Sequence, residues 1–416
     1  MNSHAASTDN DCPLILAVLN SLSNAIANGM KAFRLVLISH AEIIDRVSGS
    51  QQVCFHNFFD CKSSKVGSNR NLLFQFGSSH EFDKSILSVF CGFTILKLFE
   101  AGKIALNDPI SEYLPEFASP VVSVQSANNA ELLVPARNPI TVRHLLSMTA
   151  GLSYGGTQDA PDIATAELME ELNHGSYTVR EFSRRLAALP LAFEPGTRFR
   201  YSYCADVLGA LVEVVSGMTF GQFLKTQLFE PLGMTHTAFF FEDLPDADIV
   251  TFYSRIAGEL AADPMDEDAY SRKRGFESGG AGMLSSLSDM TRFAAALSTH
   301  TPECRVLGQK TIALMSQDHL LGQAKEDFRR ATETNAWRLL RGYSYGLGVR
   351  TLVDLPQSGI NGNCGEFGWG SVGGSFIVCD PQEELAICYL HNLHRPDNLE
   401  NLTTPRIKAM VYSQLE

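Results

Sequence analysis

The chain has few positive charges. Its 416 residues include 33 Lys and Arg against 46 Asp and Glu, which gives a formal net charge of −13 at pH 7. No local cluster of Lys and Arg offsets this balance. Because an acidic surface repels phosphate backbones and anionic membranes, neither nucleic-acid binding nor membrane binding is expected.

Paired cysteine motifs and export signals are also missing. The 9 cysteines are odd in number, irregularly spaced and without a C-x-x-C pair, which is typical of reduced thiols in an intracellular protein. Residues 1–12 are polar without a basic segment, and the apolar stretch 14–30 is interrupted by Asn and Ser. We therefore expect an amphipathic helix at 14–30, not a signal peptide or membrane span, and a cytoplasmic location.

Motifs for cofactors and metals are absent as well. The sequence contains no P-loop, dinucleotide fingerprint or zinc signature. His391 and His394 follow a predicted strand, but no third ligand lies near them in the sequence. Neither a cofactor nor a metal is expected.

The hydrophobic pattern predicts strands at both ends of the chain and helices between them. A helix is expected at Ser85–Ala101, where Gly102 ends it, and helical patterning dominates 110–330. Further elements are expected as strands at Phe33–Ser39, Glu42–Val47, Leu72–Phe76, Tyr343–Leu352, Gly374–Val378 and Leu385–Leu390, and as a helix at Pro405–Leu415. This order predicts one α/β (α+β) unit over 1–416, with a sheet domain from 1–110 and 331–416 and an inserted helical domain at 111–330.

Six sequence blocks carry a resemblance to a known superfamily. They are Ser85–Phe117, Pro139–Gly155, Leu189–Gly217, Phe229–Thr237, Phe276–Phe293 and Gly365–Gly374. In this order they resemble the β-lactamase and penicillin-binding-protein superfamily, especially the family VIII esterases and the lovastatin-type acyltransferases. The resemblance implies a mostly antiparallel sheet flanked by helices, with an inserted helical domain.

The resemblance also implies a set of site residues. Enzymes of this superfamily use a Ser at a helix N-terminus, where the backbone N–H groups favour developing negative charge. That serine matches Ser85, and the Tyr that assists proton transfer matches Tyr201. The third motif matches Trp369-Gly370-Ser371, with the N–H of Val372 facing the oxyanion. Trp369, Gly370, Ser371 and Val372 are therefore expected to bind substrate.

The lysine of the S-x-x-K motif is missing. Its position holds Ser88, in the sequence Ser85-Ile86-Leu87-Ser88. Without that general base, little or no β-lactam hydrolysis is expected. We still count Ser88 among the candidate catalytic residues, since it occupies the position of the base.

A second departure concerns the register of the nucleophile. About seven extra residues, Ser78–Lys84, lie between the strand and Ser85. The strand register would make Ser78 the nucleophile, whereas the helix register favours Ser85. The inserted segment holds His80, Glu81, Asp83 and Lys84 as possible replacement bases, and His80 is a candidate for substrate binding. Tyr203 stands where many members have Asn, and we expect it at the substrate as well.

Three functions remain open at this point. The first is a serine hydrolase or acyltransferase that acts on an ester, thioester or amide of a small organic molecule through Ser85, with Tyr201 as acid/base. The second is a repurposed biosynthetic enzyme that catalyses dehydration, isomerisation or cyclisation. The third is a catalytically inactive binding protein. The sequence does not specify the oligomeric state.

Overall fold

The computed structural model describes residues 34–39, 73–76 and 86–415, the last range with short gaps at 127, 129, 173–174, 245–251, 257–258, 264–269, 274, 301–304, 334, 372–373, 391–392 and 395–398. A six-stranded sheet organises one end of the molecule. Its strands, in spatial order, are β1 (Arg34–Ser39), β12 (Leu385–Leu390), β11 (Phe376–Asp380), β10 (Phe367–Gly370), β9 (Arg350–Leu352) and β8 (Tyr343–Tyr345). Only β1 and β12 pair in parallel within this sheet, which confirms the prediction of a mostly antiparallel sheet.

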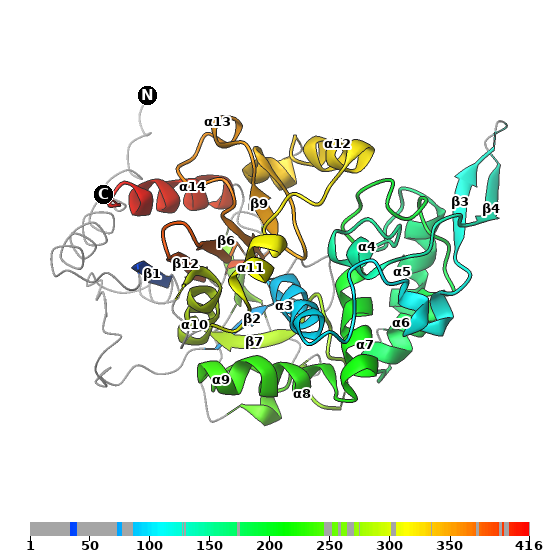
Figure 1. Ribbon diagram of the computed structural model, residues 1–416, viewed down its shortest axis with the longest axis horizontal. Coiled ribbons are helices and arrows are strands. Elements are labelled where there is room, and N and C mark those ends of the chain that lie inside the picture. Colours follow the sequence, from blue (N-terminus) through cyan, green and yellow to red (C-terminus); the bar gives the residue numbers. More distant parts are fainter. Residues whose placement is uncertain are drawn as a thin grey trace.

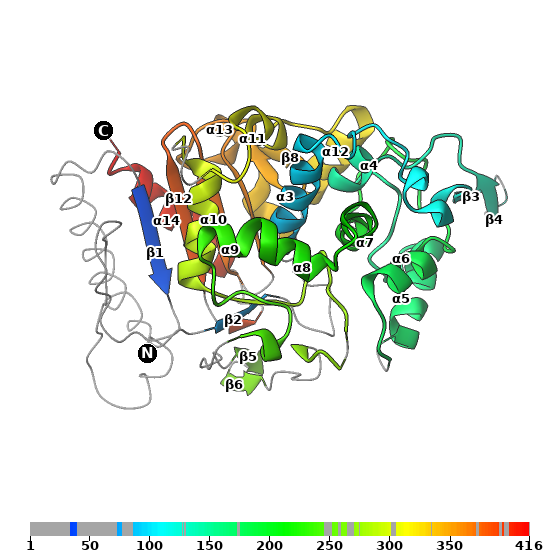
Figure 2. The ribbon, with the colours of Figure 1, turned by 60° about the horizontal axis from the view of Figure 1, so that its bottom comes forward.

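Helices cover both faces of this sheet, α14 (Leu399–Tyr412) on one side and α10 (Leu287–Ser298) on the other (Figure 2). Successive side chains of a strand point to opposite faces. On β11, Phe376 and Val378 accordingly pack with α14, whereas the Cys379 thiol reaches the Ala294 carbonyl of α10. Burial on both faces explains why β11 and β12 are continuous apolar runs rather than alternating ones.

The helix α3 (Leu87–Glu100) lies between the sheet and the helical part of the molecule (Figure 1). Almost every side chain of α3 is buried, because the helix packs against α7, α8, α11 and β10. Its end agrees with the prediction, since Gly102 takes a left-handed conformation (φ 66°). Its described helical residues begin two positions after the predicted start at Ser85.

The helical part gathers at the end of the molecule opposite α14 (Figures 1 and 2). The helices at this end are α4 (Val142–Leu146), α5 (Ala160–Leu172), α6 (Val179–Leu186) and α7 (Cys204–Ser216). The remaining described α-helices are α8 (Phe220–Leu224), α9 (Glu230–Leu232), α11 (Gln309–Met315), α12 (Gly322–Ala331) and α13 (Leu355–Ser358), the last of which connects β9 to β10. The 110–330 range also contains strands, and α10 within it packs on β1, β11 and β12.

Small sheets complete the fold. They pair β2 (Leu73–Phe76) with β7 (Met283–Ser286), β3 (Val121–Gln125) with β4 (Glu131–Pro135), and β5 (Phe252–Ile256) with β6 (Glu259–Asp263) and β13 (Leu393–His394). The β3–β4 hairpin projects from the helical end (Figure 1). Hairpins of this kind were not expected from the helical patterning of the middle of the chain.

Two predicted elements differ from the structure. The strand expected at Tyr343–Leu352 is a hairpin of β8 and β9, because Gly346 and Gly348 allow a tight turn in which the Gly346 N–H donates to the Val349 carbonyl. The helix expected to start at Pro405 starts at Leu399, so Pro405 lies inside it despite the backbone hydrogen bond that an internal proline removes.

Other predictions fall outside the described residues, namely the helix at 14–30 and the strand Glu42–Val47. Within the described residues, no single helix is long and apolar enough to cross a membrane, and only the bent pair Cys204–Ser216 and Phe220–Leu232 passes that test together. The five cysteines placed by the structure are all free.

Candidate functional site

The first turn of α3 carries Ser88, at the position where the resemblance leads us to expect a lysine. The Ser88 side chain is 1% exposed, and its hydroxyl has no hydrogen-bond partner among the described residues. Ser85 directly precedes Ile86, the first described residue of this segment, and so lies just outside the described range, as do Ser78, His80, Glu81, Asp83 and Lys84. The structure therefore places Ser88 but not Ser85, the expected nucleophile.

Tyr345 on β8 faces Ser88 across the core. Its side chain is fully buried, and its hydroxyl also has no hydrogen-bond partner in the described structure. Burial raises the pKa of Tyr345 well above its ordinary value, Tyr201 and two buried thiols raise it further, and the nearby Ser88 hydroxyl lowers it. Tyr345 is thus a protonated phenol at neutral pH. The sequence reasoning missed this residue, because nothing in a buried strand tells which distant side chain it meets.

Tyr201 lies on the segment that leads into α7, at the centre of an aromatic cluster. Its ring stacks on Trp369 with centroids 5.4 Å apart and planes 5° apart. It is also nearly parallel to Tyr154, at 5.8 Å and 7°. Tyr345 and Trp337 meet it edge to face. The structure therefore brings together Tyr201 and Trp369, two of the residues singled out in the sequence.

The Trp369-Gly370-Ser371 motif forms the end of β10. Trp369 pairs with Ile377 and Gly370 with Phe376 of β11, and the Ser371 N–H donates to the Ser375 carbonyl at 2.7 Å. The indole N–H of Trp369 is buried without a partner in the part of the chain that the structure places. Val372, the expected oxyanion donor, lies outside the described residues.

Tyr203 packs into the aromatic cluster from the start of α7. Its ring lies 4.3 Å from Tyr154 and 5.0 Å from Phe182, centroid to centroid. Burial raises the pKa of Tyr203 well above its ordinary value, and the neighbouring carboxyl of Asp206 adds to this. The phenol is therefore uncharged and packed among rings, where many members of the superfamily have a polar amide.

Asp206 is a buried carboxyl in the first turn of α7, three residues after Tyr203. Burial raises its pKa to about 6, while hydrogen bonds from Ser278 and from the backbone N–H groups of Gly279 and Gly280 oppose the rise. A carboxyl that titrates near neutral pH in such a position can hold or release a proton. The sequence reasoning did not select Asp206, since an aspartate in the first turn of a helix is ordinary.

No group of three or more His, Cys, Asp or Glu side chains in the described ranges is arranged to hold a metal ion. His391 lies outside the described residues, and the structure gives only the backbone of His394, in β13.

Comparison with known proteins agrees with this arrangement. A family model described as Beta-lactamase matches residues 85–410. The chain belongs to the beta-lactamase family. Esterase EstB of Burkholderia gladioli is 27% identical over 327 residues, which cover 74% of this chain and 76% of that protein.

Solved structures extend the comparison. EstCE1, described as a hydrolase with promiscuous acyltransferase activity, is 26% identical with a TM-score of 0.65, over 83% of this chain and 86% of that one. Simvastatin synthase (LovD) from Aspergillus terreus shares the fold with a TM-score of 0.71 at 21% identity, over 99% of this chain and 100% of that one. This beta-lactamase family member is thus an enzyme of the β-lactamase-like hydrolase and acyltransferase group.

Proposed function

We propose that the enzyme hydrolyses or transfers the acyl group of an ester, thioester or amide of a small organic molecule, with Ser85 as nucleophile and Tyr201 as acid/base. The observation that carries the proposal is the stacking of Tyr201 on Trp369. Tyr201 also meets Tyr345, whose hydroxyl lies near Ser88 on α3, three residues after Ser85 in the sequence. These contacts between the segments of Ser88, Tyr201 and Trp369 support the proposal that the three matched motifs share one site.

In this reaction Ser85 would attack the acyl carbon, and its proton would pass to the leaving group by way of Tyr201. The N-terminal N–H groups of α3 and the backbone after Trp369 would stabilise the oxyanion. The weak step is removal of the serine proton, because Ser88 supplies no amine. We therefore expect slow turnover of activated esters and no appreciable β-lactam hydrolysis.

A second candidate function is a non-acyl reaction such as dehydration, isomerisation or cyclisation. The observation that favours it is the uncharged character of the hydroxyls of Ser88 and Tyr345, which are buried and unpaired among the described residues. Protonated hydroxyls suit a general acid better than a base. In that case Tyr201 would be needed and Ser85 would be nearly dispensable.

The test is labelling with a fluorophosphonate together with steady-state kinetics on p-nitrophenyl esters of increasing chain length. We expect the wild type to be labelled, Ser85→Ala to lose label and activity, and Tyr201→Phe to lose about 10²- to 10⁴-fold in kcat/KM. Ser78→Ala is the matched control, because Ser78 is the alternative nucleophile, and it should keep both label and activity. Persistent labelling of Ser85→Ala, or a fully active and folded Tyr201→Phe protein, would overturn the proposal.

A further inference from the structure

We propose that Arg200, together with Arg198, is a positioning residue that sets the orientation of the Tyr201 ring. The proposal rests on the proposed function, since it assigns Arg200 a role through Tyr201. It starts from the alternating contacts of the four residues 198–201, immediately before α7.

The two aromatic residues of this segment point into the aromatic cluster. Phe199 meets Phe328 of α12 and Tyr345 of β8 at centroid distances of 5.1 and 5.5 Å. Tyr201 meets Trp369 and Tyr154 as described above. Phe199 therefore anchors the segment in the aromatic cluster. Stacking alone, however, still lets the Tyr201 ring slide parallel to the rings on which it stacks.

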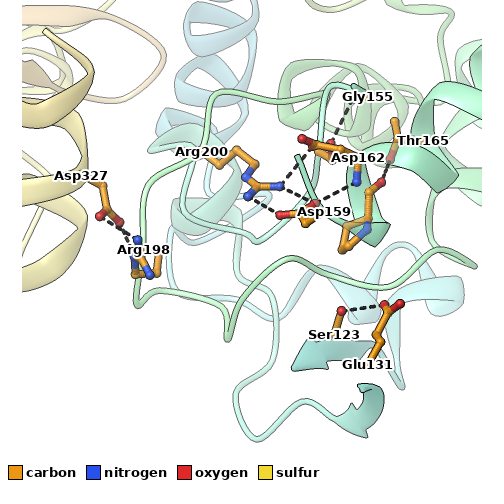
Figure 3. Close-up of polar contacts among 11 residues, drawn as sticks. Ser123, Glu131, Gly155, Asp159, Asp162, Thr165, Arg198, Arg200 and Asp327 are labelled. Atoms are coloured by element: carbon orange, nitrogen blue, oxygen red, sulfur yellow. Dashed lines mark hydrogen bonds and ion pairs between the residues drawn. The ribbon is translucent and has the colours of Figure 1, made fainter. Parts of the chain in front are cut away.

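The two arginines make ion pairs to different parts of the molecule (Figure 3). Arg200 holds Asp159 in a bidentate pair, with Nη2–Oδ2 at 2.6 Å and Nη1–Oδ1 at 3.1 Å, and its Nη1 also lies 3.1 Å from Asp162 Oδ1. Arg198 holds Asp327 of α12 in a second bidentate pair, with Nε–Oδ2 at 2.5 Å and Nη2–Oδ1 at 3.0 Å. The segment is thus anchored to the start of α5 by one arginine and to α12 by the other.

The Arg200 anchor continues to the ring that stacks on Tyr201. Ser153 donates a hydrogen bond to Asp162, and the Gly155 N–H donates to the Ser153 hydroxyl at 3.0 Å. Tyr154 lies between these two residues in the chain, and its ring is parallel to that of Tyr201. The guanidinium of Arg200 therefore ties the backbone next to Tyr201 to the loop that carries Tyr154.

The loss of these ion pairs should affect both catalysis and stability. The arginines are partly exposed, but the side chains of Asp162 and Asp327 are only 7% and 10% exposed, and removing the cation from a mostly buried carboxylate is destabilising. A displacement of about 1 Å in a reacting group can lower the rate about 10²-fold. The signature of positioning is therefore a loss of kcat in the folded protein, measured well below the Tm of each variant.

The experiment compares Arg200→Gln and Arg200→Lys with the matched control Arg184→Gln, using kcat, KM and Tm on a p-nitrophenyl ester. Arg184 makes the same bidentate pair, with Glu181 at 3.0 and 2.8 Å, but lies on α6 and not in the Tyr201 segment. We expect Arg200→Gln to lose about 10- to 10²-fold in kcat, measured well below its Tm, with little change in KM. It should lower Tm more than Arg184→Gln does, because Glu181 is 33% exposed and keeps Arg185 as a partner. Arg200→Lys should recover part of kcat. A kcat loss no larger than that of the control, or one that disappears well below the Tm of the variant, would overturn the proposal.

A double-mutant cycle with Tyr201→Phe separates this proposal from the proposed function. If Arg200 acts through Tyr201, then Arg200→Gln should add almost nothing in the Tyr201→Phe background. Additive losses would refute the positioning role and leave the function of Tyr201 intact. A fully active Tyr201→Phe protein would refute the proposed function, and this role with it.

Discussion

Restoring the lysine of the S-x-x-K motif, by Ser88→Lys, should increase the esterase activity of this protein. Ser88 lies three residues after Ser85 in the sequence, and its hydroxyl is near that of Tyr345. An amine at this position would supply a general base, which the Ser88 hydroxyl does not. A positioned general base contributes typically about 10²- to 10⁴-fold to the rate, so a gain of at least about 10²-fold in kcat/KM is expected.

The structure also sets the cost of this change. Ser88 is 1% exposed within a buried helix. The longer lysine side chain would overpack the core, which should lower the free energy of unfolding by about 1–3 kcal/mol. Burial would lower the pKa of the new amine toward neutral pH, which favours its action as a base. The new amine could bond to the Tyr345 hydroxyl, which has no hydrogen-bond partner among the described residues.

The assay is p-nitrophenyl butyrate hydrolysis with pre-steady-state burst kinetics, and thermal unfolding monitors the fold. Ser88→Met is the matched control, because methionine is close to lysine in length but has no amine. Both variants should lose similar stability, and only Ser88→Lys should gain activity. If a folded Ser88→Lys protein is no faster than Ser88→Met, residue 88 is not at the base position and the alignment of the motif is wrong.

Three further predictions concern buried polar groups. Tyr345→Phe should leave the free energy of unfolding unchanged or raise it by up to about 1 kcal/mol, because the hydroxyl that it removes has no hydrogen-bond partner within the described part of the chain. Tyr343→Phe on the same strand should lower it by about 1–3 kcal/mol, because that hydroxyl donates to Glu366 and accepts from Lys408; equal losses in urea unfolding would contradict this. The pKa of Asp206 is raised from 3.8 to about 6 in the folded protein, so the folded state binds this proton more tightly than the unfolded state does. The free energy of unfolding should therefore fall by about 3 kcal/mol as the pH rises from about 4 to about 6. Asp206→Asn should flatten that part of the stability–pH curve, and an unchanged curve would refute the assignment. Lys408→Met should destabilise the protein by about 3–5 kcal/mol, because it leaves the buried Glu366 carboxylate without its cation. A loss under about 1 kcal/mol in chemical unfolding would show that Glu366 takes up a proton instead.

The sequence by itself determined the fold class and the family resemblance. The apolar runs of β11 and β12 and the glycine after α3 depend on neighbours in the chain, and such local patterns can be read directly. The order of the motif blocks pointed to Tyr201 and Trp369, and the absence of the lysine at Ser88 needed no structure. Local patterns were not enough where one apolar run is compatible with two structures. Residues 343–352 predicted a single strand, but they form the β8–β9 hairpin.

Only the tertiary structure decided which side chains meet. Tyr345 opposite Ser88 and Arg200 on Asp159 and Asp162 join segments that are far apart in the chain. Such contacts depend on how helices and strands pack, and a single sequence carries no local record of them. The same holds for the raised pKa of Asp206, which arises from burial. Burial belongs to the folded core, and so the charge state of this site was settled by packing and not by composition.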